Sequence, residues 1–494
     1  MAIIETTEPL DPARYYGTSE MIVPLNTQEG LLRYKMGTYE FEPMLAESWE
    51  VLDGGRAFTF KIREGVTYHD GTKLNAESIK YELTRTMEIN EGPSWLLNDY
   101  VESITADGEY QLAIQLKEAV PDFLHNMAGP WAIRFQSPEA YKANEKDGDL
   151  GREWAVTHEA GTGPYKIETF DKESRVVLVR HEDYWRGWEG DHIDQLIVNV
   201  VKEGTTARLQ LEQGDLDMIL MPLQPSDYEA LAKNPDLTIG DFAGGNQFFL
   251  YFKTDRAPTD NKLVRQALSY AFNYDQVIEG VYGGHAQRIG PLLLGLEGDS
   301  EQIRSHYTFD LDKAKSLLVE AGHGDGLQLK AISVGSAPRV LLALQVFQSD
   351  LKKIGVELDV QELSGAPWRE QRDDPNADWN MLANYWAPDL LQAAGSIYVM
   401  YRCEGRTEKG AANASRWCNE EADTLMLETL TEPDAAKRVD NMTRVANIML
   451  DEAPMLWMVW PSDVWPYRKT VKNFQYNGFY TPWSARIYDL SKEG

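Results

Sequence analysis

The sequence predicts an α/β protein built from two or three domains. A chain of 494 residues is too long to fold around one hydrophobic core. Its hydrophobic fraction of 43% and aromatic fraction of 11% are typical of a well-packed globular protein. From Gly161 onward, strand-like and helix-like segments alternate, which is the pattern of α/β folds.

The first part of the chain carries several local signals. Residues 29–34 suggest a short helix. The segment 57–62 alternates apolar and polar residues after an Asp-Gly-Gly turn, which predicts a half-buried strand. A second strand with a tight turn is expected at 65–71. Asn75 then suits the N-cap of an amphipathic helix, with Ser78 at the third helical position.

Beyond Gly161, apolar runs and helical periodicity predict a longer series of elements. The expected strands are 175–180, 196–200, 218–221, 248–252, 327–334, 356–362, 379–385 and 455–460. The expected helices are 205–213, 226–232, 261–281, 310–321, 338–354 and 431–452.

Charge and hydropathy exclude some functions. The formal net charge is −30, and without a basic cluster to offset it we expect no nucleic-acid partner. The acidity favours solubility in a salty or extracytoplasmic setting over a specific partner. The sequence contains no run of about 18 apolar residues, so we predict no membrane-spanning segment. Residues 1–4 lead directly into polar sequence, so we expect either a cytoplasmic protein or one whose signal peptide has been removed.

The segment 378–418 combines groups that suit a binding site. A strand-like run ends at Trp386, and Asp389 follows three residues later, where α/β proteins place ligand contacts. Cys403 and Cys418 flank a loop rich in small and polar residues. A disulfide would stabilise this loop by roughly 3 kcal/mol and indicates an oxidising compartment. Two cysteines without a nearby histidine do not suit a zinc site.

Other motifs do not indicate catalysis, metal or cofactor binding. His69 and Asp70 have no partner histidine pair and fit a turn after a strand. The Gly161-Thr162-Gly163 run lacks the third glycine of a dinucleotide loop and precedes a strand. We therefore expect no metal and no cofactor. A hydrolase that uses paired carboxylates is the alternative from another class, because composition does not exclude it.

The stretch LAESWEVLDGGRAFTFKIREGVTYHDGTKLNAESIKYEL, at 45–83, resembles a hallmark of the family 5 extracellular solute-binding proteins. Further similar motifs follow in order, among them GTGPY at 161–165 and LVRQALSYA at 263–271. Members of this family are binding components of ABC importers for peptides, opines, sugars and nickel.

The resemblance implies a two-lobed periplasmic binding protein of type II, with an extra subdomain in the N-terminal lobe. It implies a monomeric, periplasmic, non-catalytic protein that delivers a small-molecule ligand to an ABC transporter permease. We expect these boundaries: 1–42, lobe I, first part; 43–160, extra subdomain; 161–245, lobe I, second part; 246–475, lobe II; and 476–494, the C-terminal return to lobe I.

The resemblance also assigns site residues. In peptide-binding members a Trp-x-x-Asp lies some 17 residues before the first disulfide cysteine, and its aspartate receives the peptide α-ammonium. Trp386 and Asp389 fit this pattern and imply an aromatic wall and an ammonium anchor. The alternatives are a core tryptophan and a helix cap. Secondary contacts are expected from Tyr385, Asn246, Gln247 and Glu29.

One departure from the family pattern bears on the ligand. The arginine that grips the carboxylate in the dipeptide binder would fall at Val334 or Gly335, and the nearby Arg339 opens the next helix. The sequence thus favours a longer peptide or an amine-bearing opine over a strict dipeptide. An oligosaccharide is the main alternative, and a nickel chelate is disfavoured because no histidine cluster is visible.

Overall fold

The structure divides into two compact units. The structure is a computed structural model. Unit 1 comprises residues 1–245 and 463–494, and unit 2 comprises residues 246–462. No helix in the described part of the chain is long and apolar enough to cross a membrane. The described residues are 1–4, 9–16, 21–36, 38, 40–335, 337–388, 391–404, 413–480 and 484–493.

Unit 1 contains a four-stranded sheet in the order β1-β10-β9-β8. Its strands are β1 (Ala2–Ile3), β8 (Tyr165–Asp171), β9 (Arg175–Arg180) and β10 (Gln195–Val200). Val176 and Leu178 of β9 are buried and pack in the same core as Trp465 from the C-terminal segment. The predicted strands at 175–180 and 196–200 are therefore confirmed.

A second four-stranded sheet lies within the interval 43–160, in the order β4-β5-β7-β6. Phe58, Phe60 and Ile62 of β5 are fully buried, as the alternation predicted. The strands are β4 (Ala46–Leu52), β5 (Ala57–Ile62), β6 (Val101–Ala106) and β7 (Gln111–Leu116).

Helix α2 (Ala76–Ile89) begins with the predicted cap. The Asn75 side chain accepts a hydrogen bond from the Ser78 N–H (2.9 Å), and the Ser78 hydroxyl accepts one from the Asn75 N–H (3.0 Å). This reciprocal arrangement satisfies two N–H groups that the helix leaves unpaired. The remaining helices of unit 1 are α1 (Pro24–Thr27), α3 (Trp95–Asn98), α4 (Leu124–Ala128), α5 (Pro138–Asn144), α6 (Gly204–Gln213) and α7 (Pro225–Leu231).

Three local predictions for unit 1 were wrong. The short helix expected at 29–34 is instead β2 (Leu32–Tyr34), which pairs with β3 (Phe41–Pro43). Residues 65–71 form turns with one isolated bridge between Thr67 and Lys73, because the glycines at both ends hold positive φ angles. Residues 218–221 make only isolated bridges, one of them from Met218 to Tyr467.

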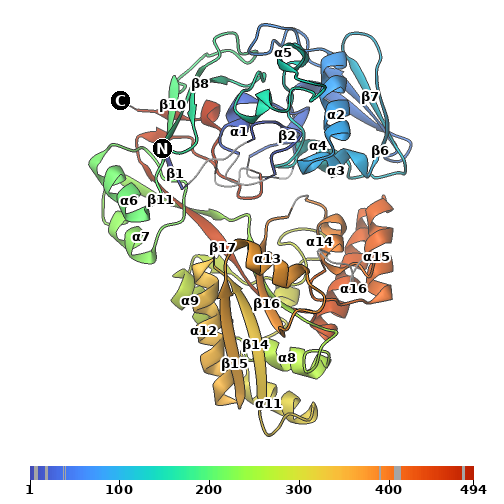
Figure 1. Ribbon diagram of the computed structural model, residues 1–494, viewed down its shortest axis with the longest axis vertical. Coiled ribbons are helices and arrows are strands. Elements are labelled where there is room, and N and C mark those ends of the chain that lie inside the picture. The colour runs from blue at the N-terminus through green and yellow to red at the C-terminus, as the bar shows by residue number, and fades with distance from the viewer. Residues whose placement is uncertain are drawn as a thin grey trace. The chain divides into compact units, whose positions relative to one another are not determined.

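Unit 2 is built on a sheet in which β17, β12, β16, β14 and β15 are successive neighbours. Figure 1 shows helix α12 (Pro338–Lys353) running along β14 and β15. Buried side chains from this sheet and from the helices packed against it form one large hydrophobic core. The strands are β12 (Gln247–Phe252), β13 (Ala286–Gln287), β14 (Leu327–Val334), β15 (Val356–Leu363), β16 (Met381–Trp386) and β17 (Met455–Arg468).

The helix expected at 261–281 is two helices, α8 (Lys262–Tyr270) and α9 (Tyr274–Tyr282). Asn273 ends the run because its side chain accepts a hydrogen bond from the Gln276 N–H and so caps a new helix. The other helices of unit 2 are α10 (Glu301–Arg304), α11 (Leu311–Glu320), α13 (Gly365–Asp373), α14 (Ala393–Tyr401), α15 (Glu420–Thr431) and α16 (Ala435–Glu452).

Strand β17 continues past the end of unit 2. Its residues up to Pro461 pair with β12 and β13, and after Ser462 the chain belongs to unit 1. There β17 neighbours β11 (Leu237–Ala243), and the Ile219 N–H donates to the Pro466 carbonyl (2.9 Å). Unit 2 thus ends before the expected boundary at 475. The short strands β18 (Val471–Lys472) and β19 (Ser491–Lys492) complete unit 1.

Candidate functional site

The end of β16 and the start of β12 lie side by side in unit 2. In this antiparallel pair Trp386 is opposite Gln247, and Tyr385 is opposite Phe248. Asn246 directly precedes Gln247 in the chain. The pairing therefore brings together four of the predicted contact residues, which come from two distant segments of sequence.

Aromatic side chains at this strand end remain accessible. Tyr385 is 41% exposed and Trp386 is half-buried, so neither is a fully buried core residue. The rings of Tyr385 and Phe248 are 5.7 Å apart between centroids. Gln247, in contrast, is buried. Tyr385 and Trp386 thus offer accessible flat surface for a ligand, whereas the amide of Gln247 is covered in this structure.

Sequence reasoning missed how this aromatic group extends toward Arg339. The Phe248 ring lies 6.5 Å from Tyr282, and the Arg339 guanidinium lies 5.5 Å from the centre of the Tyr282 ring. Arg339 stands in the first turn of α12, as expected from the sequence. The contact with Tyr282 depends on how α9 and α12 pack, and no sequence spacing reveals it.

The expected anchor Asp389 lies outside the described residues, as does Leu390. The described chain resumes at Leu391, and helix α14 begins at Ala393 with Gln392 in its N-cap position. The role of Asp389 as ammonium anchor stays a prediction, and so does the alternative of a helix cap.

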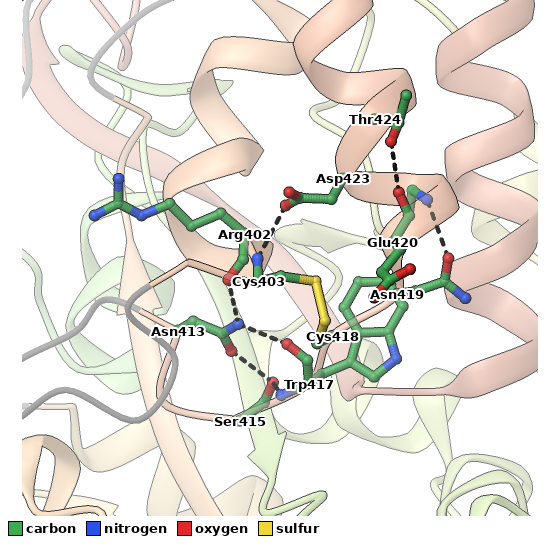
Figure 2. The surroundings of a disulfide bond; sticks show 11 residues. Arg402, Cys403, Asn413, Ser415, Trp417, Cys418, Asn419, Glu420, Asp423 and Thr424 are labelled. Atoms are coloured by element: carbon green, nitrogen blue, oxygen red, sulfur yellow. Dashed lines mark hydrogen bonds between the residues drawn. A yellow bond between two sulfur atoms is a disulfide. The ribbon is translucent and has the colours of Figure 1, made fainter.

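The predicted disulfide between Cys403 and Cys418 is present, and Figure 2 shows its surroundings. The two Cα atoms are 4.7 Å apart. The Cys403 N–H donates to the Asp423 carboxylate in α15 (2.9 Å). The Asn419 side chain caps α15 by accepting from the Ala422 N–H (3.0 Å). The bridge thus joins the chain after α14 to the beginning of α15.

Asn413 reinforces the same loop from inside. Its side-chain amide donates to the carbonyls of Arg402 (2.9 Å) and Trp417 (2.7 Å), and its oxygen accepts from the Ser415 hydroxyl (3.0 Å) (Figure 2). Asn413 is only 1% exposed. Although Asn413-Ala414-Ser415 fits a glycosylation pattern, the amide nitrogen already donates two hydrogen bonds.

Glu29 belongs to unit 1, where three donors surround its carboxylate. The Tyr184 hydroxyl donates to Oε1 (2.7 Å), and the Thr162 hydroxyl and the Trp185 indole N–H donate to Oε2 (both 2.9 Å). Burial raises the pKa of this carboxyl, and the three hydrogen bonds oppose that rise. These contacts tie Glu29 to the segment before β8 and to the segment after β9, and a ligand contact by Glu29 stays a prediction.

His69 is also engaged within unit 1. Its Nδ1 lies 2.9 Å from the Glu159 carboxylate, and its Nε2 lies 2.9 Å from the Gly163 carbonyl. The His181 ring packs against it at 4.9 Å, and burial lowers the pKa of His181 to about 4. Within the described ranges, no group of three or more His, Cys, Asp or Glu side chains could hold a metal ion.

Comparison with known proteins identifies the family. The sequence model described as "Bacterial extracellular solute-binding proteins, family 5 Middle" matches residues 40–408. The chain belongs to this family. The resemblance stated from the sequence is thereby confirmed, and the family is one of solute-binding proteins.

Two relatives of this family 5 protein align along most of their length. Heme-binding protein A of Haemophilus influenzae is 26% identical, with 94% of this chain and 88% of the relative covered. The dipeptide-binding protein of Escherichia coli is also 26% identical, with coverage of 92% and 86%.

A solved structure has the same fold. The ABC transporter-associated periplasmic binding protein DppA of Helicobacter pylori, in complex with the peptide STSA, superimposes with a TM-score of 0.82 at 22% identity. The match covers 100% of this chain and 97% of that one. The predicted fold class, the mixed α/β fold of the two-lobed periplasmic binding proteins, is confirmed.

Proposed function

We propose that this family 5 protein captures a peptide or a peptide-like, amine-bearing ligand outside the cytoplasm and delivers it to the permease of an ABC importer. The observation that carries the proposal is the strand end at Trp386. There, Trp386 lies opposite Gln247 and next to the exposed Tyr385, and Asp389 follows Trp386 three residues later in the sequence. The relative named as a dipeptide-binding protein and the solved structure with the bound peptide STSA support this ligand class.

Each group has a chemical role in the proposal. Asp389 accepts a charge-assisted hydrogen bond from the ligand ammonium, a contact that strengthens when water is excluded. Trp386 and Tyr385 provide flat walls against which side chains or peptide planes pack. Asn246 offers an amide donor and acceptor to the ligand backbone, and Gln247 and Glu29, both buried in this structure, are the secondary contacts of the proposal.

In this proposal the protein is a periplasmic monomer that binds its ligand without a metal or cofactor and catalyses no reaction. An opine fits the same ammonium anchor, because opines retain an amine. An oligosaccharide remains the second candidate for one reason: the aromatic rings of Trp386, Tyr385 and Phe248 suit stacking against sugar faces.

The first experiment is native mass spectrometry of the purified protein, which identifies any ligand that stays bound. Calorimetry then compares tetrapeptides that carry a free or an acetylated N-terminus. We expect micromolar binding of the free form and a loss of at least tenfold on acetylation. Asp389→Ala should cause a similar loss, whereas Asp359→Ala, an exposed carboxylate on β15, should not. Equal binding of both peptides by the wild-type protein would contradict the ammonium anchor.

A further inference from the structure

Unit 1 gathers positive charge around two adjoining cavities, although the chain as a whole carries a net charge of −30. The inner cavity measures about 40 Å³ and the outer groove about 420 Å³. Arg33, Arg486 and Asp489 line both. Five cations surround the two spaces against three carboxylates: Arg33, Lys35, Arg134, Arg186 and Arg486 against Glu29, Glu42 and Asp489.

Arg486 is the least satisfied of these cations. Its side chain is 9% exposed, and its Nε and Nη1 have no hydrogen-bond partner among the described residues. The nearest carboxylate oxygens are Asp489 Oδ2, 3.1 Å from Nε, and Glu42 Oε1, 3.7 Å from Nη1. A buried guanidinium normally satisfies its donors through direct hydrogen bonds.

The carboxylates nearby serve other partners as well. Arg33 donates directly to Oε1 of Glu42, the same oxygen that Arg486 approaches. Asp489 also lies 4.0 Å from Arg186. Burial lowers the pKa of Arg486, and the neighbouring charge of Arg33 lowers it further. Three guanidinium groups, those of Arg33, Arg186 and Arg486, thus share the two carboxylates of Glu42 and Asp489.

Two other members of the cluster, Arg134 and Glu29, are satisfied within unit 1. Arg134 donates to the Tyr15 hydroxyl (2.9 Å) and the Pro130 carbonyl (3.0 Å). The carboxylate of Glu29 holds its own three donors. Arg134 and Arg186 add positive potential to the cavities, while Arg486 is the group with unsatisfied donors and Arg33 lines the same two spaces beside it.

We propose that Arg486 and Arg33 form a binding site for a small oxyanion, a carboxylate or a phosphate group. The planar guanidinium fork matches both groups and binds them through paired hydrogen bonds. An anion entering by the outer groove reaches both arginines, because both line that groove. The volume of the inner cavity suits a group of a few atoms. This site lies wholly in unit 1 and does not depend on the proposed peptide anchor in unit 2.

The test measures binding of sodium phosphate and sodium acetate to the whole protein, with sodium chloride at equal ionic strength as reference. We expect calorimetry to detect binding of at least one oxyanion and thermal unfolding to shift upward with it. Arg486→Gln and Arg33→Gln should each weaken this binding at least tenfold. Arg444→Gln, an exposed arginine paired with Glu421 in unit 2, should leave it unchanged.

Further arms identify the bound group and guard against misfolding. Stronger binding of acetate than of phosphate assigns a carboxylate, and the reverse assigns a phosphate. Arg33→Lys keeps the charge but loses the fork, so it should weaken the oxyanion even if Arg486→Gln does not fold. The proposal is overturned if neither oxyanion binds more than chloride, or if the Arg33 variants bind as the wild type does.

Discussion

Trp386, the last residue of β16, lies directly across the sheet from Gln247, the first residue of β12. Trp386 ends one strand and Gln247 begins the other. A half-buried indole and a buried amide therefore lie side by side at one end of the strands of the unit 2 sheet. The next residues of the chain lead to Asp389. This pairing gives the proposed binding site a rigid base on two core strands rather than on loops alone.

Replacing the indole at 386 tests its role as a ligand wall. Trp386→Ala should weaken the peptide found in the calorimetric screen by about 5- to 30-fold, since a packed aromatic ring contributes roughly 1–2 kcal/mol. Trp386→Phe keeps a flat ring and should retain most of the affinity. Circular dichroism should show both variants folded. If the alanine variant binds as tightly as the wild type, the indole does not contact the ligand.

Removing the disulfide should destabilise the protein without abolishing the fold. The double variant Cys403→Ser and Cys418→Ser removes the cross-link between two positions that are 15 residues apart in the sequence. Because the unfolded chain then gains conformational entropy, the free energy of unfolding should fall by roughly 3 kcal/mol. Urea unfolding followed by tryptophan fluorescence measures this change.

Thiol chemistry provides the control for that experiment. Titration of the unreduced wild-type protein should find no free thiol, because both cysteines of the chain are in the bridge. A reducing agent should lower wild-type stability and leave the double variant unchanged. Two titratable thiols in the unreduced protein would contradict both the bridge and the oxidising compartment inferred from it.

Glu29→Ala should reduce stability, because it leaves Thr162, Tyr184 and Trp185 without their shared acceptor. We expect a loss of about 2–4 kcal/mol in the free energy of unfolding. Glu182→Ala removes an exposed carboxylate from the same part of unit 1 and should change stability by less than about 0.5 kcal/mol. Equal stability of the two variants would contradict a structural role for Glu29. Their peptide affinities, measured in parallel, test whether Glu29 also contacts the ligand.

Local signals in the sequence predicted much of the secondary structure. The alternation at Phe58, Phe60 and Ile62 and the cap at Asn75 depend on neighbours within a few residues, so both were correct. The single helix expected at 261–281 was wrong because apolar periodicity continues across the break, although Asn273 carried a cap signal. Secondary structure is predictable from the sequence where the local signals agree with the fold.

The candidate site could be predicted only in part, since its contacts are non-local. The sequence predicted a strand that ends at Trp386, as observed, but no spacing reveals that Gln247 lies opposite Trp386. The neighbourhood of Arg486 and Arg33 depends in the same way on packing between β2 and the C-terminal segment. Residue types indicate which chemistry is possible, whereas strand register and helix packing decide which groups meet.

The carboxyl group of Asp463 should make stability depend on pH. Asp463 is the first residue of unit 1 after unit 2 and accepts hydrogen bonds from the Tyr476 hydroxyl (2.7 Å) and the Gly245 N–H. Burial raises its pKa to about 7, against roughly 3.9 in an unfolded chain. The folded state therefore binds the proton more tightly, and the free energy of unfolding should fall as pH rises from about 4 to 7.

Asp463→Asn isolates this contribution, because an amide keeps an acceptor oxygen for Tyr476 and Gly245 but never ionises. At pH 8 the variant should be more stable than the wild type, by an amount on the order of 3 kcal/mol, and near pH 4 the difference should vanish. Urea unfolding of both proteins at the two pH values measures it. Burial also raises the pKa of Glu82 to about 7. Because Glu82 is present in both proteins, its contribution to the pH dependence cancels in the comparison. A difference that does not change with pH would contradict a titrating Asp463 with a raised pKa.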